Sequence, residues 1–125
     1  MNHQHHLIES SEAIVLDTET TGMVEPQVIE LAWVVVDHPQ SMVTTASFHS
    51  FYKPSKPVEL GALSTHNIIE EDYQDAPPSS ELKLPGGIGY MIGHNIDYDW
   101  GARGKPQCRR ICTLALSRHS FPDID

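Results

Sequence analysis

The feature that most constrains this chain is a run of apolar residues that ends in two closely spaced carboxylates. Residues 14–16 (Ile-Val-Leu) lead into Asp17, and Glu19 follows two positions later. In an extended strand, residues i and i+2 point to the same face, so the pattern predicts two neighbouring carboxylates at the end of a buried strand. Like charges this close raise each other's pKa. A hard divalent cation that prefers oxygen ligands, Mg²⁺ or Mn²⁺, would keep both groups ionised.

The residues after the carboxylates suit the edge of a phosphate or a sugar. Thr20 and Thr21 carry hydroxyl groups, and Gly22 is free to adopt positive φ. The alternative is an ordinary polar turn at a strand end, where Asp, Thr and Gly are common. The Asp-x-Glu spacing alone favours the turn. The full string Asp-Thr-Glu-Thr-Thr-Gly, placed directly after three apolar residues, favours a functional site.

Hydrophobic periodicity predicts one α/β domain over residues 13–125, preceded by a flexible N-terminus over residues 1–12. Glu30 interrupts the apolar second strand, and it is either partnered in the core or directed toward the carboxylate site. Three strands before the first helix favour a mixed sheet. The expected strands are 13–17, 28–37, 42–52, 88–93 and 110–113, with a hairpin turn at 37–41 and helices at 58–65, from about Asp97 through Asp99, and at 114–119.

Charge is distributed unevenly along the chain, whose formal net charge is −9. Residues 1–102 carry 15 acidic and 3 basic residues, whereas residues 103–125 carry five basic and two acidic ones. The basic segment is either a solvated surface or a phosphate-contacting edge. Cys108 and Cys112 lie four apart, roughly 13 Å along a strand at about 3.3 Å per residue, too far for a disulfide. No secretory signal or membrane span is visible, so a cytoplasmic location is expected.

A second motif follows the predicted strand at 88–93. It is Gly93-His94-Asn95-Ile96-Asp97-Tyr98-Asp99, and it places a further carboxylate at the start of a helix. Together with the first string, this motif resembles the DEDD superfamily of 3′→5′ exonucleases. The resemblance runs from about residue 13 to residue 122. It implies an RNase H-like fold with a mixed five-stranded sheet and flanking helices.

The resemblance also implies a chemistry. Asp17, Glu19 and Asp99 would be the catalytic carboxylates and would hold two divalent ions, Mg²⁺ or Mn²⁺. The substrate would be the 3′ end of a nucleic acid, DNA with RNA as the alternative. The residues that would contact this substrate are Thr20, Thr21, Gly22, Met23, His94 and Asn95.

The third motif of these exonucleases, His-x₄-Asp, is not matched after the second one. His119 has Asp123 at i+4 and Asp125 at i+6, but Ile124 at i+5. The sequence therefore predicts a C-terminally truncated fold and a weakened enzyme. The alternative function is a module that binds a 3′ end or a protein without cutting. A homodimer is one expected way of covering the sheet face that the missing helix would leave bare.

Overall fold

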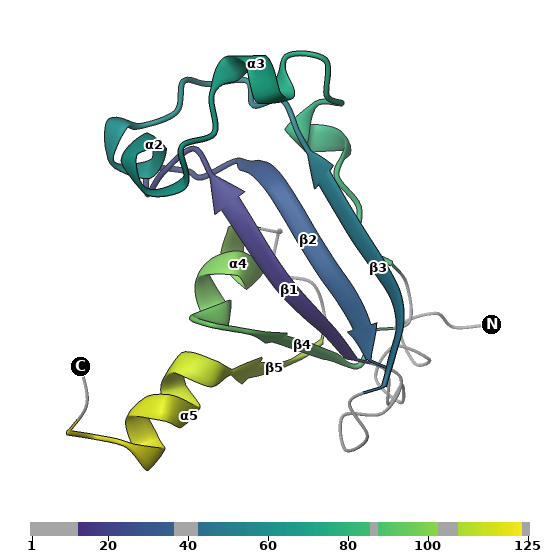
Figure 1. The fold of residues 1–125 in the computed structure, drawn as a ribbon, viewed down its shortest axis with the longest axis vertical. Coiled ribbons are helices and arrows are strands. Elements are labelled where there is room, and N and C mark those ends of the chain that lie inside the picture. The colour runs from purple at the N-terminus through teal and green to yellow at the C-terminus, as the bar shows by residue number, and fades with distance from the viewer. Residues whose placement is uncertain (1–12, 37–42, 86–87, 103–107, 124–125) are drawn as a thin grey trace.

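Five strands form one mixed sheet in the order β3-β2-β1-β4-β5 (Figure 1). The computed structural model describes residues 13–36, 43–85, 88–102 and 108–123. The first three strands are antiparallel neighbours, and the last two run parallel to β1. The predicted mixed five-stranded sheet is confirmed. Its strands are β1 (Ala13–Thr20), β2 (Val28–Val36), β3 (Thr44–Phe51), β4 (Tyr90–Gly93) and β5 (Arg109–Cys112).

The strand boundaries differ from the predicted ones by up to three residues. β1 continues to Thr20 because its pairing with β2 persists past Asp17, with an irregularity between Glu19 and Thr20. β4 begins at Tyr90, two residues later than predicted. The predicted N-terminal segment 1–12 and the predicted hairpin turn at 37–41 lie outside the described residues.

The helices are short and lie at the ends and on one side of the sheet (Figure 1). Asn67 ends α2 in the left-handed conformation, with φ 57°. The backbone N–H of Ile69, the residue before α3, donates to the carboxylate of Asp72, 2.9 Å away, so a side chain within the helix satisfies this N–H group. No helix within the described ranges is long and apolar enough to cross a membrane. The helices are α2 (Leu60–His66), α3 (Glu70–Tyr73), the 3₁₀ turn η1 (Ser79–Glu81), α4 (Ile96–Ala102) and α5 (Thr113–Ser120).

The hydrophobic core lies between the sheet and α4. Ile14 and Leu16 of β1, Met91 of β4 and Ile96 of α4 are all at most 2% exposed. Val15, between the two buried residues of β1, is exposed, as the two-residue period of a strand requires. α4 covers the core face of the sheet, and no described helix lies over the opposite face (Figure 1). Asp17 lies on that opposite face and is exposed.

The unequal length of β1 and β4 creates the place where the second motif meets the first. β4 pairs only with residues 13–15 of β1, so the rest of β1 has an open edge on that side. The chain turns at Asn95, which has φ 60°, and α4 begins at Ile96. This turn brings α4 to the open edge of β1. The free cysteines Cys108 and Cys112 are half-buried on and beside β5, as predicted.

Candidate active site

Three carboxylates from the two motifs lie around the open edge of β1. Asp17 and Glu19 project from the strand on the face opposite the core, with Asp17 exposed and Glu19 half-buried. Asp99 lies in the first turns of α4 and is only 5% exposed. The strand alternation predicted from the sequence therefore places the first pair, and the turn before α4 adds the third carboxylate.

Asp99 is fixed by hydrogen bonds to β1. The backbone N–H of Thr18 donates to Asp99 Oδ1 at 3.1 Å, and the Thr18 hydroxyl donates to the same oxygen. Thr18 can do this because its backbone N–H lies on the edge that β4 leaves unpaired. The approach of α4 also needs Gly93, since a Cβ there would lie 2.7 Å from Ile96 Cδ1 and 3.0 Å from the Leu16 carbonyl oxygen.

The carboxylates share one electrostatic environment. Burial is the largest cause that raises the pKa of Asp99 above its ordinary value; the Asp17 charge raises it further, while the Thr18 hydrogen bonds lower it. Burial is also the largest cause that raises the pKa of Glu19, followed by the Asp17 charge. His66 opposes this rise, and the charges of Glu30 and Asp99 add to it. The protein thus holds carboxylates close enough to disfavour each other's ionisation.

The donor set fits a hard divalent cation in its chemistry. Asp17, Glu19 and Asp99 offer only carboxylate oxygens, the ligands that Mg²⁺ and Mn²⁺ prefer. A cation would also relieve the repulsion that raises the pKa of Glu19 and of Asp99. As the side chains lie, the described part of the chain contains no group of three His, Cys, Asp or Glu residues close enough to form a ready metal-binding cluster. Binding would therefore require the carboxylates to close around the ion.

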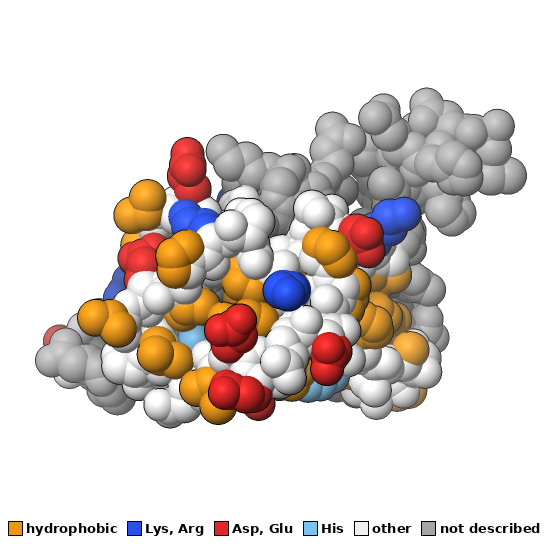
Figure 2. Space-filling view, turned by 90° about the horizontal axis from the view of Figure 1, so that it is seen from above, with side chains coloured by type: hydrophobic (Ala, Val, Ile, Leu, Met, Phe, Trp, Pro, Cys, Tyr) orange, Lys and Arg blue, Asp and Glu red, His pale blue; other side chains and the backbone are white. Residues whose placement is uncertain are grey.

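A cavity of about 310 Å³ opens beside Glu19, between the end of β1 and α2. Thr20, Gly22 and Met23 form one wall, and Met23 is 78% exposed at its mouth. The end of the molecule seen in Figure 2 carries hydrophobic side chains interspersed with carboxylates and with several Lys or Arg side chains. The other lining side chains are Glu59, Ala62, Thr65 and His66 around α2, and Tyr98 from α4.

The predicted substrate residues separate into two groups. Thr20, Gly22 and Met23 line the cavity. Thr21 is fully buried, and its hydroxyl accepts a hydrogen bond from the backbone N–H of Gln27 at 3.0 Å. Thr21 therefore shapes the loop in this structure.

His94 and Asn95 do not line the cavity in the structure. His94 is exposed, and its Nδ1 lies 3.1 Å from the Thr113 hydroxyl. Asn95 adopts positive φ at the turn into α4. Contact of these two residues with a substrate stays a prediction.

The α2 wall of the cavity was missed by sequence reasoning. His66 Nε2 lies 3.1 Å from the carbonyl oxygen of Thr20, so α2 is attached directly to the end of β1. Glu59 accepts a hydrogen bond from the backbone N–H of Val24 at 3.2 Å. The segment Ala62-Leu63-x-x-His66 followed by Ile68 was the available signal. It indicated a helix, but it did not place that helix against the first motif.

The Tyr98 hydroxyl connects α4 to the loop that follows β1. It donates to the carbonyl oxygen of Gly22 at 2.8 Å and also bonds to the Thr20 hydroxyl. Gly22 has φ 143°, and a Cβ at this position would collide with the Glu59 carboxylate. The cavity wall and Asp99 are therefore positioned by the same helix.

The basic C-terminal segment is only partly described. Arg110 forms an ion pair with Asp97, with 2.6 Å between Nη1 and Oδ1. Arg109 Nη1 donates to the Tyr90 hydroxyl at 3.2 Å. Arg103 and Lys105 lie outside the described residues, so phosphate contact by this segment stays a prediction.

In buffer without divalent ions, Asp99→Asn is expected to raise the melting temperature by a few degrees at neutral pH. A carboxylic acid whose pKa is raised on folding favours the folded state when protonated, and this contribution is lost as pH rises through the folded pKa. The ordinary pKa values are 3.8 for Asp99 and 4.5 for Glu19, so the loss occurs above these values. The asparagine amide oxygen can still accept both Thr18 hydrogen bonds.

Thermal denaturation monitored by circular dichroism at pH 4 and pH 7 measures the effect of Asp99→Asn, with Asp75→Asn as an exposed control of equal charge change. The stabilisation by Asp99→Asn is expected to be larger at pH 7 than at pH 4. Equal melting temperatures for Asp99→Asn and wild type at pH 7 would show that the Asp99 carboxylate carries no ionisation penalty.

Comparison with known proteins agrees with the geometry. The sequence model of the exonuclease family RNase_T matches residues 14–123. DNA polymerase III subunit epsilon of Salmonella typhimurium is 31% identical over 134 aligned positions, covering 87% of this chain and 54% of that protein. Exodeoxyribonuclease 10 of Escherichia coli is 27% identical, covering 88% of this chain and 49% of that protein. The chain thus spans about half the length of these curated relatives.

Solved structures show the same fold. Exonuclease X, in complex with 5′ overhanging duplex DNA, superposes with a TM-score of 0.74 at 23% identity, over 90% of this chain and 66% of that one. An exonuclease I structure superposes with a TM-score of 0.71 at 14% identity, over 92% of this chain and 31% of that one. The family match over nearly the whole chain, together with this RNase H-like sheet, shows that the chain belongs to the exonuclease family of the DEDD superfamily.

Proposed function

We propose that this chain is a 3′→5′ exonuclease domain that hydrolyses phosphodiester bonds at the 3′ ends of DNA. The observation that carries the proposal is that Asp17, Glu19 and Asp99 lie around the open edge of β1 within electrostatic range of one another, with a cavity of about 310 Å³ beside Glu19. Carboxylates that raise each other's pKa on a rigid strand and helix are typical of a catalytic metal site. Membership of the exonuclease family supports the reaction class. The DNA in the complex of the exonuclease X neighbour supports the substrate class.

Asp17, Glu19 and Asp99 would hold Mg²⁺ or Mn²⁺, two ions in a complete site. When bound, such ions supply charge stabilisation of the phosphoryl group and a stronger water nucleophile. The protein contributes the positions of its own groups. Thr18 orients Asp99 through two hydrogen bonds. The Tyr98 hydroxyl holds the loop at Gly22, beside Glu19.

The cavity next to Glu19 suits the terminal nucleotide. Its mouth carries the exposed Met23 side chain, which offers an apolar surface to a base. Thr20 and Thr65 offer hydroxyl groups inside it, and His66 offers a ring nitrogen. The described residues that line the cavity include the carboxylates of Glu19 and Glu59 and no Lys or Arg, so a bound cation would help a phosphate to approach.

The second candidate function is a module that binds a 3′ end or a protein without cutting. The sequence after Asp99 favours it, because His119 lacks an aspartate at i+5. In the leading proposal, a site without a general base would work about 10²–10⁴-fold more slowly than one that has it. The predicted homodimer that would cover the bare face of the sheet remains part of the proposal.

A 5′-labelled single-stranded oligonucleotide incubated with the protein and Mn²⁺ separates these functions. Progressive shortening from the 3′ end is expected, and a 3′-phosphorylated oligonucleotide should be cut more slowly. Retention on a native gel without shortening would identify the binding module. Release of the label as a mononucleotide before any shortened intermediates appear would contradict the proposed direction. A matched RNA oligonucleotide tests the preference for DNA.

A further inference from the structure

Two further ionisable side chains lie on the sheet face that carries Asp17 and Glu19. Glu30 of β2 is the direct partner of Glu19 in β1, and His49 of β3 is the partner of Ala32, which itself faces Asp17. Directly paired residues of neighbouring strands point to the same face of a sheet. The open face therefore carries a row of ionisable side chains that begins at the proposed metal site and continues across three strands.

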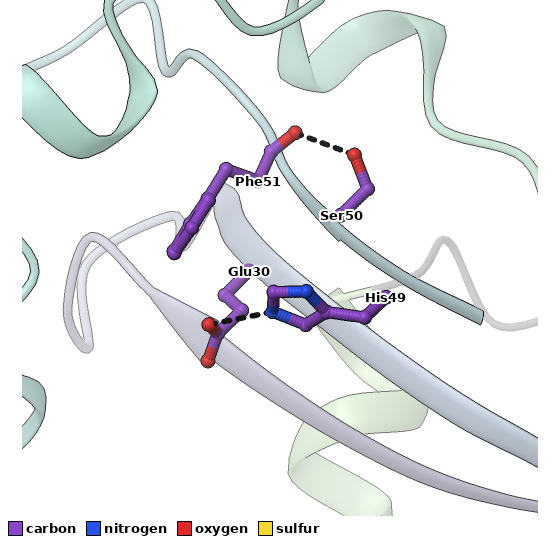
Figure 3. Close-up of polar contacts among 4 residues, drawn as sticks. All are labelled: Glu30, His49, Ser50 and Phe51. Atoms are coloured by element: carbon purple, nitrogen blue, oxygen red, sulfur yellow. Dashed lines mark hydrogen bonds and ion pairs between the residues drawn. The ribbon is translucent and has the colours of Figure 1, made fainter. Parts of the chain in front are cut away.

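Glu30 of β2 is held by a side chain that reaches across from β3. Its Oε2 lies 2.9 Å from His49 Nε2, and the His49 ring packs edge-on against Phe51, with centroids 5.3 Å apart (Figure 3). The Glu30 side chain is 29% exposed and the His49 side chain 55%. His49 is therefore the partner of the Glu30 carboxylate, which the sequence alone did not identify. The direct partner of Glu30 in the neighbouring strand β1 is Glu19.

We propose that Glu30, anchored by His49, is a positioning residue of the carboxylate site: its charge strengthens divalent-cation binding there, while its contact with His49 holds the carboxylate in place. The inference rests on the proposed function. A fixed negative charge on the β2 side of Glu19 attracts a cation through space. It also repels the Glu19 carboxylate toward the edge of β1 where Asp99 lies. Figure 3 shows the Glu30 carboxylate turned to the His49 ring.

The size of the effect follows from Coulomb's law. A unit charge roughly 7 Å from a divalent cation, in a water-like dielectric with moderate salt, changes the affinity about 2- to 10-fold. Loss of a direct ligand would cost far more and would not be screened by salt. A purely structural ion pair between β2 and β3 would leave the cation affinity unchanged, since exposed pairs of this kind contribute little even to stability.

Isothermal titration of the full chain with Mn²⁺ tests the proposal. Glu30→Gln removes the charge but retains an oxygen that can accept from His49, and it should weaken Mn²⁺ binding about 2- to 10-fold. The deficit should shrink strongly between about 50 mM and about 500 mM salt. Glu30→Asp keeps the charge and should restore most of the affinity. Glu81→Gln, which removes an exposed charge from η1, is the matched control and should bind like wild type.

His49→Ala is a further variant to be tested in the same Mn²⁺ titration. It keeps the Glu30 charge, so Mn²⁺ should bind at least as tightly as to wild type. Wild-type affinity in Glu30→Gln, a deficit that persists at high salt, or equal weakening by His49→Ala and Glu30→Gln would each overturn the proposal. If Mn²⁺ binding by wild type is absent or insensitive to Asp17→Asn, the proposed function fails as well. Asp17-dependent binding with unaltered affinity in Glu30→Gln would refute only the role of Glu30.

Discussion

Replacing Asp17 by asparagine is expected to weaken Mn²⁺ binding by at least about 100-fold and to remove the nuclease activity. Loss of an outer-shell partner of a metal ligand alone typically costs about 10–100-fold in affinity, and Asp17 is proposed as a direct ligand. A catalytic metal ion contributes several kcal/mol to transition-state stabilisation. At about 1.4 kcal/mol per tenfold change, the expected loss of rate is on the order of 10³-fold.

The fold should tolerate Asp17→Asn because Asp17 is exposed and lies outside the core. Titration calorimetry measures the affinity, and the 5′-labelled oligonucleotide assay measures the rate relative to wild type. Asp75→Asn removes the same charge from an exposed position and controls for net charge. Unchanged Mn²⁺ affinity in Asp17→Asn would refute the placement of the metal at the end of β1, even if the rate fell.

The part of the site that lies on one strand could be predicted from the sequence. Asp17 and Glu19 share a face because a strand repeats every two residues, and this period depends only on the local backbone. Asp99 could be placed because its motif follows an apolar strand and opens a helix. The pKa values of Glu19 and Asp99 are raised in the structure, chiefly by burial and to a smaller extent by the neighbouring Asp17 charge that the sequence pattern predicted.

The part of the site that depends on tertiary packing was not visible in the sequence. His66 reaches the carbonyl of Thr20 across 46 positions of the chain, and Glu59 reaches Val24 across 35. Contacts between residues this far apart in the chain leave no periodic pattern in the sequence. The residue that contacts Glu30 could not be predicted from the sequence for a similar reason. His49 becomes its neighbour only through the register of β2 with β3, which the sequence does not specify to the residue.

The same structure explains why the enzyme and the binding module share one sequence signature. Thr18, Tyr98 and His66 fix the cavity and Asp99 through hydrogen bonds that need neither a cation nor a general base. On the proposed function, a chain with these contacts would hold a 3′ end whether or not it cuts. The distinction between the two functions therefore depends on the supply of a general base, which the carboxylates alone do not provide.

Ile96→Ala is expected to destabilise the protein by about 2–5 kcal/mol, the range for truncating a fully buried isoleucine. Ile96 is 0% exposed, and its side chain packs over Gly93 at the point where α4 joins the sheet. Its loss leaves a cavity between β4 and α4. Urea denaturation measures the change. The same substitution at Ile69, which is 50% exposed, should cost clearly less.

Ile96→Ala should also affect the metal site, because Asp99 lies three residues further along α4. A looser helix weakens the two hydrogen bonds by which Thr18 holds Asp99. Mn²⁺ affinity measured well below the melting temperature should therefore fall, but by less than in Asp17→Asn, where a ligand is lost. Destabilisation with wild-type Mn²⁺ affinity would mean that Asp99 is positioned by Thr18 alone, independently of how α4 packs on the core.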